Sequence, residues 1–437
     1  MGQFRVPGSG FHAVLSSGSE FEVHGSQFRD GVALGTQNQA PRTFNQNVNT
    51  NPERGTRNWE ATRRVLIVGV STRAAAESAA RAGFDVIALD GYADLDQHPS
   101  VRALSLPRDF GKAFSAETIA AVASRLSGDA IVYLSNLENH PKMVDALSSG
   151  RMLWGNASDV LRRVRDPQVL AQAFVARGIR APRVVTSGQK VEQHDDVERW
   201  LIKPRASGGG HGVRPGSAKE PLMRGQYLQE FVDGIVGSVV FVAANGGGVA
   251  LATSRQLVGE SVFGASGFGF CGNIVTPRVS EHAADALRAL VDAVCETFPL
   301  AGLGSIDFVR TDRELRPIEV NPRWSASMEL VEGAYGISLF AIHADACARA
   351  VLPQFDLTQQ PLTGSARGKA IVFARHDVVA PDTRRWLDDP TVRDVPHPGE
   401  RILAGQPICT VFAEGSDDAA CHAKLIERAE RIYAELV

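Results

Sequence analysis

An alternation of strand-like and helix-like segments opens the regularly patterned part of the chain and restricts its fold more than any other feature. Residues 65–68, Val-Leu-Ile-Val, form an apolar run typical of a buried parallel strand, and a helical stretch at 73–82 follows. Two more apolar runs occur at 85–89 and 130–134, with a helical segment near 116–126 between them. Strands joined in sequence by helices predict an open parallel α/β sheet.

The length of 437 residues exceeds what one hydrophobic core usually serves, so we expect several domains. Residues 1–62 end in an Asn- and Gln-rich stretch and predict a disordered or atypical N-terminal extension. We assign the α/β domain to 63–160 and an α+β domain, in which paired strands dominate, to 161–355. Residues 356–437 predict a small C-terminal β-rich domain that ends in a helix.

Charge and cysteine usage exclude several classes of protein. Lys and Arg number 46 against 49 Asp and Glu, for a net charge of −3, so neither nucleic acid nor a membrane is expected as a partner. No apolar stretch is long enough to cross a bilayer. The five cysteines form no C-x-x-C pair, which argues against a disulfide framework or a structural zinc site and favours a cytoplasmic location.

The segment from Gly304 to Arg323 gives the clearest chemical signal. If it forms a hairpin centred on Arg313, then Asp307 lies directly opposite Glu319, and Asn321 shares the sheet face of Glu319. Two carboxylates and an amide oxygen suit Mg²⁺, with Mn²⁺ as an alternative ion. Arg323, two residues after Asn321, is aimed toward the same ion-and-phosphate region by the extended residue before Pro322. The other interpretation is a solvated hairpin whose acids face water.

Two further elements indicate phosphate and nucleotide binding. A strand ending at Lys203 precedes the glycine-rich segment 206–212, in which Gly209, Gly210 and Gly212 let backbone N–H groups approach phosphate oxygens. This segment is not a Walker-type loop, because no G-x-x-x-x-G-K-[ST] pattern occurs in the chain. By itself it also fits a flexible surface loop. An alternating stretch at 227–234, Tyr-Leu-Gln-Glu-Phe-Val-Asp-Gly, predicts a strand that ends in a tight turn.

The chain resembles the ATP-grasp superfamily, in particular ATP-dependent carboligases or carboxylate–amine ligases. The resemblance rests on three elements in this order: the lysine with its glycine loop, the 227–234 strand and the acidic hairpin. The resemblance implies an α/β domain, then an α+β ATP-grasp domain and a small β-rich domain. It implies that Lys203 and Arg323 contact phosphate, that the glycines cover the triphosphate, and that Asp307, Glu319 and Asn321 bind magnesium. Adenine would be received by a strand segment, namely Gln229, Glu230 and Val232.

Two positions depart from the pattern of the superfamily. Pro167 stands where many members carry a second nucleotide-binding lysine, so either Arg165 or nothing replaces it. The ribose-binding glutamate expected after Gly234 is missing, and Asp233 is the nearest candidate. Residues 259–273, rich in glycine and phenylalanine, predict either a closing loop or an ordinary mobile one. Arg255, Ser325, Ser327 and Glu329 are guesses for the acceptor site.

The resemblance implies an ATP-dependent carboxylate–amine ligase that forms an amide through an acyl phosphate, with ATP and Mg²⁺ as cofactors. Its substrates would be a small carboxylate and an amine, for which an amino acid is one option, and a homodimer is left open. Two alternatives come from other classes. One is a non-catalytic ATP-binding module, and the other is an NAD-dependent oxidoreductase, which the missing second and third glycines after Gly69 disfavour.

Overall fold

The computed structural model describes residues 64–187, 199–275, 278–359, 361 and 364–436, so the predicted N-terminal extension lies outside the described residues. A parallel sheet with strand order β3-β2-β1-β4-β5 forms the first part, as predicted. Its strands are β1 (Arg64–Val68), β2 (Asp85–Asp90), β3 (Val101–Ser105), β4 (Ala130–Tyr133) and β5 (Met152–Leu153). Its helices are α1 (Arg73–Arg81), α2 (Leu106–Phe110), α3 (Ala116–Ala123), the 3₁₀ turn η1 (Leu137–Asn139), α4 (Pro141–Ser148) and α5 (Ser158–Val164).

This sheet is buried on both faces, which explains the continuous apolar run of β1. On one face the small side chains of Ala75, Ala76 and Ala79 let α1 pack closely. Asp90 ends β2 at the place where a ribose-binding acid would lie in a dinucleotide fold. Its carboxylate instead accepts hydrogen bonds from the backbone N–H groups of Thr72 and Ala93, so within the described chain it serves to fix the turns that follow β1 and β2.

The central sheet is antiparallel, with strand order β14-β13-β10-β11-β12-β15-β19-β17. In chain order its members are β10 (Ile235–Ala244), β11 (Gly247–Val258), β12 (Phe270–Val275), β13 (Gly302–Arg310), β14 (Leu315–Asn321), β15 (Ala366–Phe373), β17 (Val392–Arg393) and β19 (Pro407–Gly415). Three strands beyond residue 356 therefore extend the sheet that the preceding hairpins begin. Asn245 and Gly246, both with positive φ, make a two-residue turn between β10 and β11.

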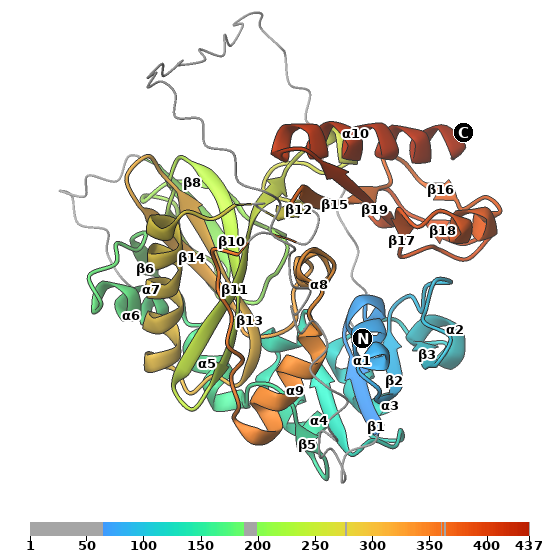
Figure 1. Ribbon diagram of the computed structural model, residues 1–437, viewed down its shortest axis with the longest axis horizontal. Helices are drawn as coiled ribbons and strands as arrows, with labels where there is room; N and C mark the ends of the chain where they lie inside the picture. The colour runs from blue at the N-terminus through green and yellow to red at the C-terminus, as the bar shows by residue number, and fades with distance from the viewer. Residues whose placement is uncertain (1–63, 188–198, 276–277, 360, 362–363, 437) are drawn as a thin grey trace, which may run out of the picture. The chain divides into compact units, whose positions relative to one another are not determined.

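Helices cover the central sheet at separate places. Helix α6 (Pro167–Val175) and α7 (Glu281–Thr297) pack against β10 and β13, whereas α10 (Asp418–Glu435) packs along β15 and β19 (Figure 1). Helices α8 (Met328–Tyr335) and α9 (Leu339–Arg349) join the core that contains α1. The remaining short elements are η2 (Ser261–Phe263), η3 (Thr383–Asp388) and the pair β16 (Val378–Val379) and β18 (Arg401–Ile402).

A third, four-stranded sheet has the order β6-β9-β7-β8. Its strands are β6 (Val184–Thr186), β7 (Trp200–Pro204), β8 (Arg214–Gly216) and β9 (Gln226–Glu230). The turn between β7 and β8 carries the glycine loop, which we define as residues 206–212. The predicted strand at 200–203 lies beside the strand predicted to begin at residue 227, which ends at Glu230 and not at the expected turn near Gly234. Their hydrogen-bonded register brings Lys203 and Gln229 to the same region.

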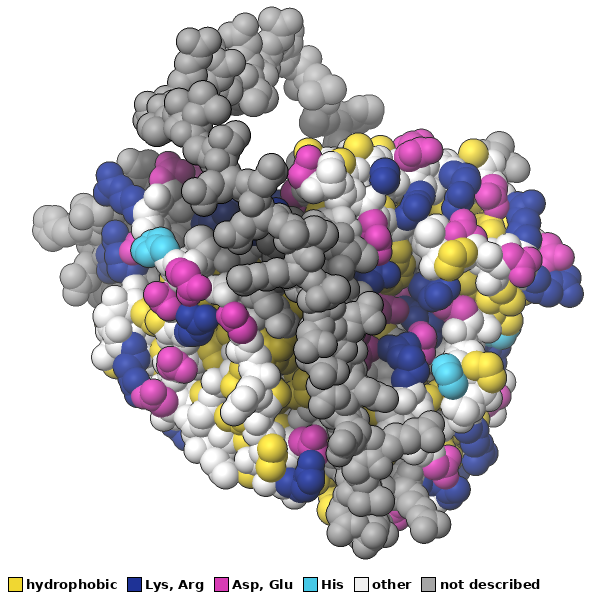
Figure 2. All heavy atoms as spheres, in the orientation of Figure 1, with side chains coloured by type: hydrophobic (Ala, Val, Ile, Leu, Met, Phe, Trp, Pro, Cys, Tyr) yellow, Lys and Arg dark blue, Asp and Glu magenta, His cyan; other side chains and the backbone are white. Residues whose placement is uncertain are grey.

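Within the described segments, no helix combines the length and the apolarity needed to cross a bilayer. Basic and acidic side chains are interspersed over the face shown in Figure 2, in keeping with the nearly balanced composition. All five cysteines are free thiols, and four of them are buried.

Candidate functional site

One cleft of about 960 Å³ brings the predicted residues together. Its walls come from the carboxyl ends of β1 and β4, from the glycine loop, from β9 and from one face of the central sheet. This volume is at the upper end for small-molecule sites and leaves room for a nucleotide together with a second ligand. The residues that the resemblance assigns to phosphate, adenine and magnesium all line the cleft: Lys203, Gly209, Gly210, Gly212, Gln229, Glu230, Val232, Asp307, Glu319, Asn321 and Arg323.

The acidic pair on β13 and β14 has the predicted partners but not the predicted turn. Asp307 pairs with Glu319, as expected. Nearer the tip, Val309 pairs with Arg316 instead of residue 317, because the turn is centred one half-residue earlier than Arg313. A β-bulge then absorbs the extra residue and restores the register at Asp307.

The bulge also redirects one side chain. Alternation predicts Ile318 on the core face together with Ile306, Phe308 and Val320. The last three are buried in the core shared with α7, whereas Ile318 lines the cleft. The expectation for Ile318 was therefore wrong, since a bulge shifts the alternation by one residue.

The pKa values of Asp307 and Glu319 are shifted in opposite directions, although the two carboxylates are neighbours. Burial, and then the negative charge of Glu319, raise the pKa of Asp307 to about 6. Burial alone would also raise the pKa of Glu319, but the cations Arg165 and Lys203 hold it below its ordinary value. Asp307 thus keeps its proton below about pH 6, and above that pH the two ionised carboxylates repel each other and favour a bound cation.

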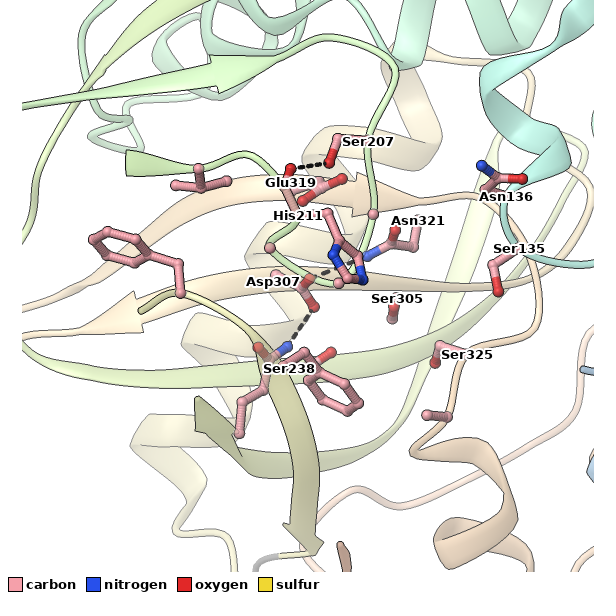
Figure 3. A pocket seen from close by; sticks show the side chains of 18 of the residues that line it. Ser135, Asn136, Ser207, His211, Ser238, Ser305, Asp307, Glu319, Asn321 and Ser325 are labelled. Carbon is pink, nitrogen blue, oxygen red and sulfur yellow. Dashed lines mark hydrogen bonds between the residues drawn. The ribbon is translucent and has the colours of Figure 1, made fainter. Parts of the chain in front are cut away.

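Neighbouring side chains satisfy the carboxylate oxygens in the absence of any ligand. Gln256 Nε2 donates to Asp307 Oδ1 at 2.9 Å, and Asn321 Nδ2 donates to Asp307 Oδ2 at 3.1 Å. Arg165 forms an ion pair with Glu319. Figure 3 shows Asp307, Glu319 and Asn321 pointing into the same part of the cleft. Gln256 was not predicted, although its alternation on β11 places it on this face.

The oxygen donors of this group fit a hard divalent cation. Within the described residues there is no cluster of three or more His, Cys, Asp or Glu side chains suited to a metal ion. The predicted magnesium ligands include only two carboxylates, and the amide oxygen of Asn321 is the third ligand. Such a set is typical of Mg²⁺ sites in which water and nucleotide phosphate supply the remaining ligands.

Lys203 is buried and only 9% exposed, at the end of β7. Its Nζ donates to Gln229 Oε1 at 3.1 Å, and Gln229 in turn donates to the carbonyl of Ile318. Burial would lower the pKa of Lys203, but Tyr227, Glu319 and Asp307 raise it above its ordinary value. The lysine is therefore a fixed positive charge that faces the acidic pair.

The glycine loop packs against the segment before β12. Phe270 N donates to Gly209 O at 3.0 Å. Gly210 has φ +76°, and a Cβ there would lie 1.8 Å from the carbonyl oxygen of Phe268. Only glycine fits this approach. The loop and the predicted closing segment 259–273 thus contact each other, and Phe268 and Phe270 line the cleft.

Arg323 is held by a residue that the sequence did not indicate. Its Nε donates to Glu138 Oε1 at 2.9 Å, and one of its terminal N–H groups donates to Asn321 Oδ1 at 3.1 Å. The side chain of Glu138 is fully buried, and its Oε2 has no hydrogen-bond partner among the described residues. Glu138 comes from η1, far from Arg323 in sequence, and no periodicity marks it.

The two departures from the superfamily pattern have different outcomes. Arg165 lines the cleft and pairs with Glu319, so a cation is present near the position of the missing lysine. Asp233 is exposed, pairs with Arg199 and is absent from the residues that line the cleft. Glu230 lines the cleft, but Arg316 binds its carboxylate at 3.2 Å.

Of the four residues suggested for an acceptor site, two line the cleft and two do not. Ser325 and Ser327 line the cleft. Arg255 is not among the lining residues and pairs with Asp418 at the start of α10, because neighbouring residues of a strand point to opposite faces and Gln256 takes the cleft face. Glu329 does not line the cleft, but it binds Lys369, which does.

Comparison with known proteins identifies the domain that carries this site. The family model described as "ATP-grasp domain" matches residues 165–327. These residues therefore form an ATP-grasp domain, and the resemblance drawn from Lys203, the glycine loop and the acidic hairpin is confirmed. The match spans the glycine loop, β9 and both strands of the hairpin.

A curated relative and several solved structures are similar over most of the chain. Uncharacterized protein MJ0776 of Methanocaldococcus jannaschii is 20% identical over 371 residues, covering 80% of this chain and 88% of that protein. Pyruvate carboxylase of Rhizobium etli has a TM-score of 0.65 and 16% identity over 85% of this chain, which spans only 37% of that enzyme.

Two other structures match over nearly their whole length. An L-amino acid ligase from Bacillus licheniformis has a TM-score of 0.61 and 14% identity, covering 84% of this chain and 97% of its own. The biotin carboxylase domain of the Hydrogenobacter thermophilus 2-oxoglutarate carboxylase, in complex with MgADP and bicarbonate, has a TM-score of 0.61 and 13% identity, covering 85% and 89%. At these identities the likeness shows the ATP-grasp fold alone.

Proposed function

We propose that this protein is an ATP-dependent carboxylate–amine ligase. The observation that carries the proposal is the convergence of Asp307, Glu319, Asn321, Lys203 and Arg323 in a single cleft of an ATP-grasp domain. The likeness to an L-amino acid ligase supports the same class of reaction. Magnesium, when bound by the two carboxylates and the amide, would neutralise phosphate charge.

The residues of the chain would contribute mainly orientation and charge. Lys203 and Arg323 would supply positive charge close to the acidic pair, where the transferred phosphoryl group would lie. The glycine loop would cover the phosphates through its backbone N–H groups, and Gln229 to Val232 would receive the adenine. His211 lines the cleft, but its ring makes no hydrogen bond to a serine, cysteine or acid among the described residues, and the mechanism requires no protein nucleophile.

In the proposed reaction a substrate carboxylate oxygen attacks the γ-phosphorus, and the bond from that phosphorus to the β,γ-bridging oxygen breaks to release ADP. The nitrogen of a neutral amine then attacks the acyl carbon, and the carbon–oxygen bond to phosphate breaks. The products are an amide, phosphate and a proton. Covering the cleft would protect the acyl phosphate from water, for which the contact between the glycine loop and Phe268 is suitably placed.

A screen for ADP release over carboxylate and amine libraries, with mass spectrometry of the products, tests the proposal. We expect ADP formation that requires magnesium, an acid and an amine together. Asp307→Asn and Glu319→Gln should each abolish it, whereas Asp312→Asn, at an exposed acid in the turn of the same hairpin, should leave it unchanged. Full turnover in the Asp307 or Glu319 variant would reject the assigned ligands, and nucleotide binding without ADP formation for any pair would favour a non-catalytic ATP-binding module.

A further inference from the structure

A row of polar side chains leads across the central sheet away from the acidic pair. Gln256, which contacts Asp307, pairs in register with Asn273 on β12, and Asn273 pairs with Lys369 on β15. All four residues line the same cleft. Lys369 therefore belongs to the cleft wall at a place well separated from the candidate magnesium ligands.

Lys369 is unusual because it is a lysine buried in the wall of a cleft. The residue is only 5% exposed, and its Nζ donates one hydrogen bond, to Glu329 Oε2 at 2.9 Å. The Phe412 ring lies 5.6 Å from the same nitrogen. An ammonium group has three N–H donors, so within the described structure two remain for a ligand.

Glu329 and Arg73 hold Lys369 in place. Arg73 is fully buried and donates to Glu329 Oε1 at 2.6 Å and to Asp394 Oδ1 at 2.6 Å. Burial would raise the pKa of Glu329, but Arg73 and Lys369 lower it to about 2, so the carboxylate stays ionised. The ammonium group is thus fixed before any ligand arrives, which reduces the entropic cost of binding.

We propose that Lys369 binds a second carboxylate of the substrates, one that is not activated by ATP. This inference rests on the proposed ligase function and specifies the class of substrate. Four strand spacings separate β13 from β15, which corresponds to roughly 19 Å across the sheet. A carboxylate held at Lys369 is therefore too far from Asp307 to be the one that reacts, even after allowing for the length of the lysine side chain.

The charge of the cluster selects a carboxylate over a phosphate. Arg73 and Lys369 pair with four carboxylates, those of Glu77, Asp96, Glu329 and Asp394, so the cluster holds no uncompensated positive charge. A singly charged carboxylate can share the two free N–H donors, whereas the second negative charge of a phosphate dianion would be buried without a cation. The serine hydroxyl groups of Ser71, Ser325 and Ser327 line the cleft as uncharged hydrogen-bonding groups suited to the rest of such a molecule.

Binding measurements that do not require turnover test this inference. Saturation-transfer NMR with the full chain would compare glutarate, adipate, pimelate, suberate and L-glutamate with their monoamides. We expect at least one acid to bind about 10-fold or more tightly than its amide, a difference of about 1.4 kcal/mol. Lys369→Met should remove this preference and Lys369→Arg should largely keep it. Lys424→Met, at an exposed lysine of α10, should change nothing.

Nucleotide titrations of the same variants separate this inference from the proposed function. The Kd for MgATP should be unchanged in Lys369→Met, which also shows that the variant is folded. An undiminished preference for the acid in Lys369→Met, or no preference in the wild type, overturns the inference while ADP formation still supports the ligase. Failure of the wild type to bind nucleotide would overturn the proposed function itself.

Discussion

Replacing Asp307 by Asn should stabilise the protein while it abolishes activity, because the acidic pair is costly without a cation. The pKa of Asp307 is raised from 3.8 to about 6, which corresponds to at most about 3 kcal/mol of stability. A raised carboxyl pKa means that the folded chain binds the proton more tightly than the unfolded one. Stability is thus greatest below pH 4 from this group and is lost as the pH rises through about 6.

The variant Asp307→Asn cannot ionise and should not suffer this loss. At pH 8, without divalent cations, we expect it to melt up to about 3–4 °C above the wild type, since a unit of this size has a large unfolding entropy. At pH 4.5 the difference should shrink to about a third, because the unfolded chain releases the proton there while the folded chain keeps it. Differential scanning fluorimetry at the two pH values measures both. Adding magnesium at pH 8 should raise the melting temperature of the wild type only. A difference of the same size at both pH values, or a variant less stable at pH 8, would refute the reasoning.

Three other substitutions give separate tests. Gly210→Ala should lower kcat at least about 10-fold with little change in melting temperature, because the added Cβ would lie 1.8 Å from Phe268 O. Gly208→Ala is the matched control, since its Cβ would meet nothing within 4 Å. Equal activities of the two variants would contradict the packing described. Lys203→Met should raise the Kd for MgATP about 10-fold or more, and nucleotide titration would show otherwise if Lys203 only supports Gln229. Arg323→Met should cost about 3–5 kcal/mol in denaturant unfolding by leaving the buried Glu138 unpaired, and Glu138→Gln in the same chain should recover part of that stability without recovering activity.

In the acidic hairpin the sequence predicts the pairing of the two acids but not the turn or the bulge that together produce this pairing. Alternation with period two predicts that Asp307 faces Glu319, and this pairing is confirmed. The turn position was wrong by half a residue, and a bulge next to Ile318 restored the pairing. Bulges depend on the packing of neighbouring strands, so a single hairpin sequence does not reveal them.

Glu138 and Gln256 illustrate the limits set by distance along the chain. Glu138 meets Arg323 across 185 positions, and its surroundings in η1 have no pattern that marks a buried acid. Gln256 lies on β11, two strands away from Asp307 in the sheet and 51 positions away in the sequence, so local patterning does not reveal their contact. The parallel sheet, by contrast, could be predicted from local apolar runs because both of its faces are buried.

The salt bridges of Arg73 join distant segments of the described chain, so these segments should be difficult to produce as separate fragments. Its guanidinium belongs to α1, yet the carboxylates that neutralise it include Glu329, beyond the central hairpin, and Asp394, close to the end. A gene truncated at residue 160 would leave Arg73 with only Glu77 and Asp96 as partners, and one truncated at residue 355 would keep Glu329 as well but lose Asp394. Expressed separately, such pieces should be poorly soluble, whereas mixing them during refolding should restore a complex.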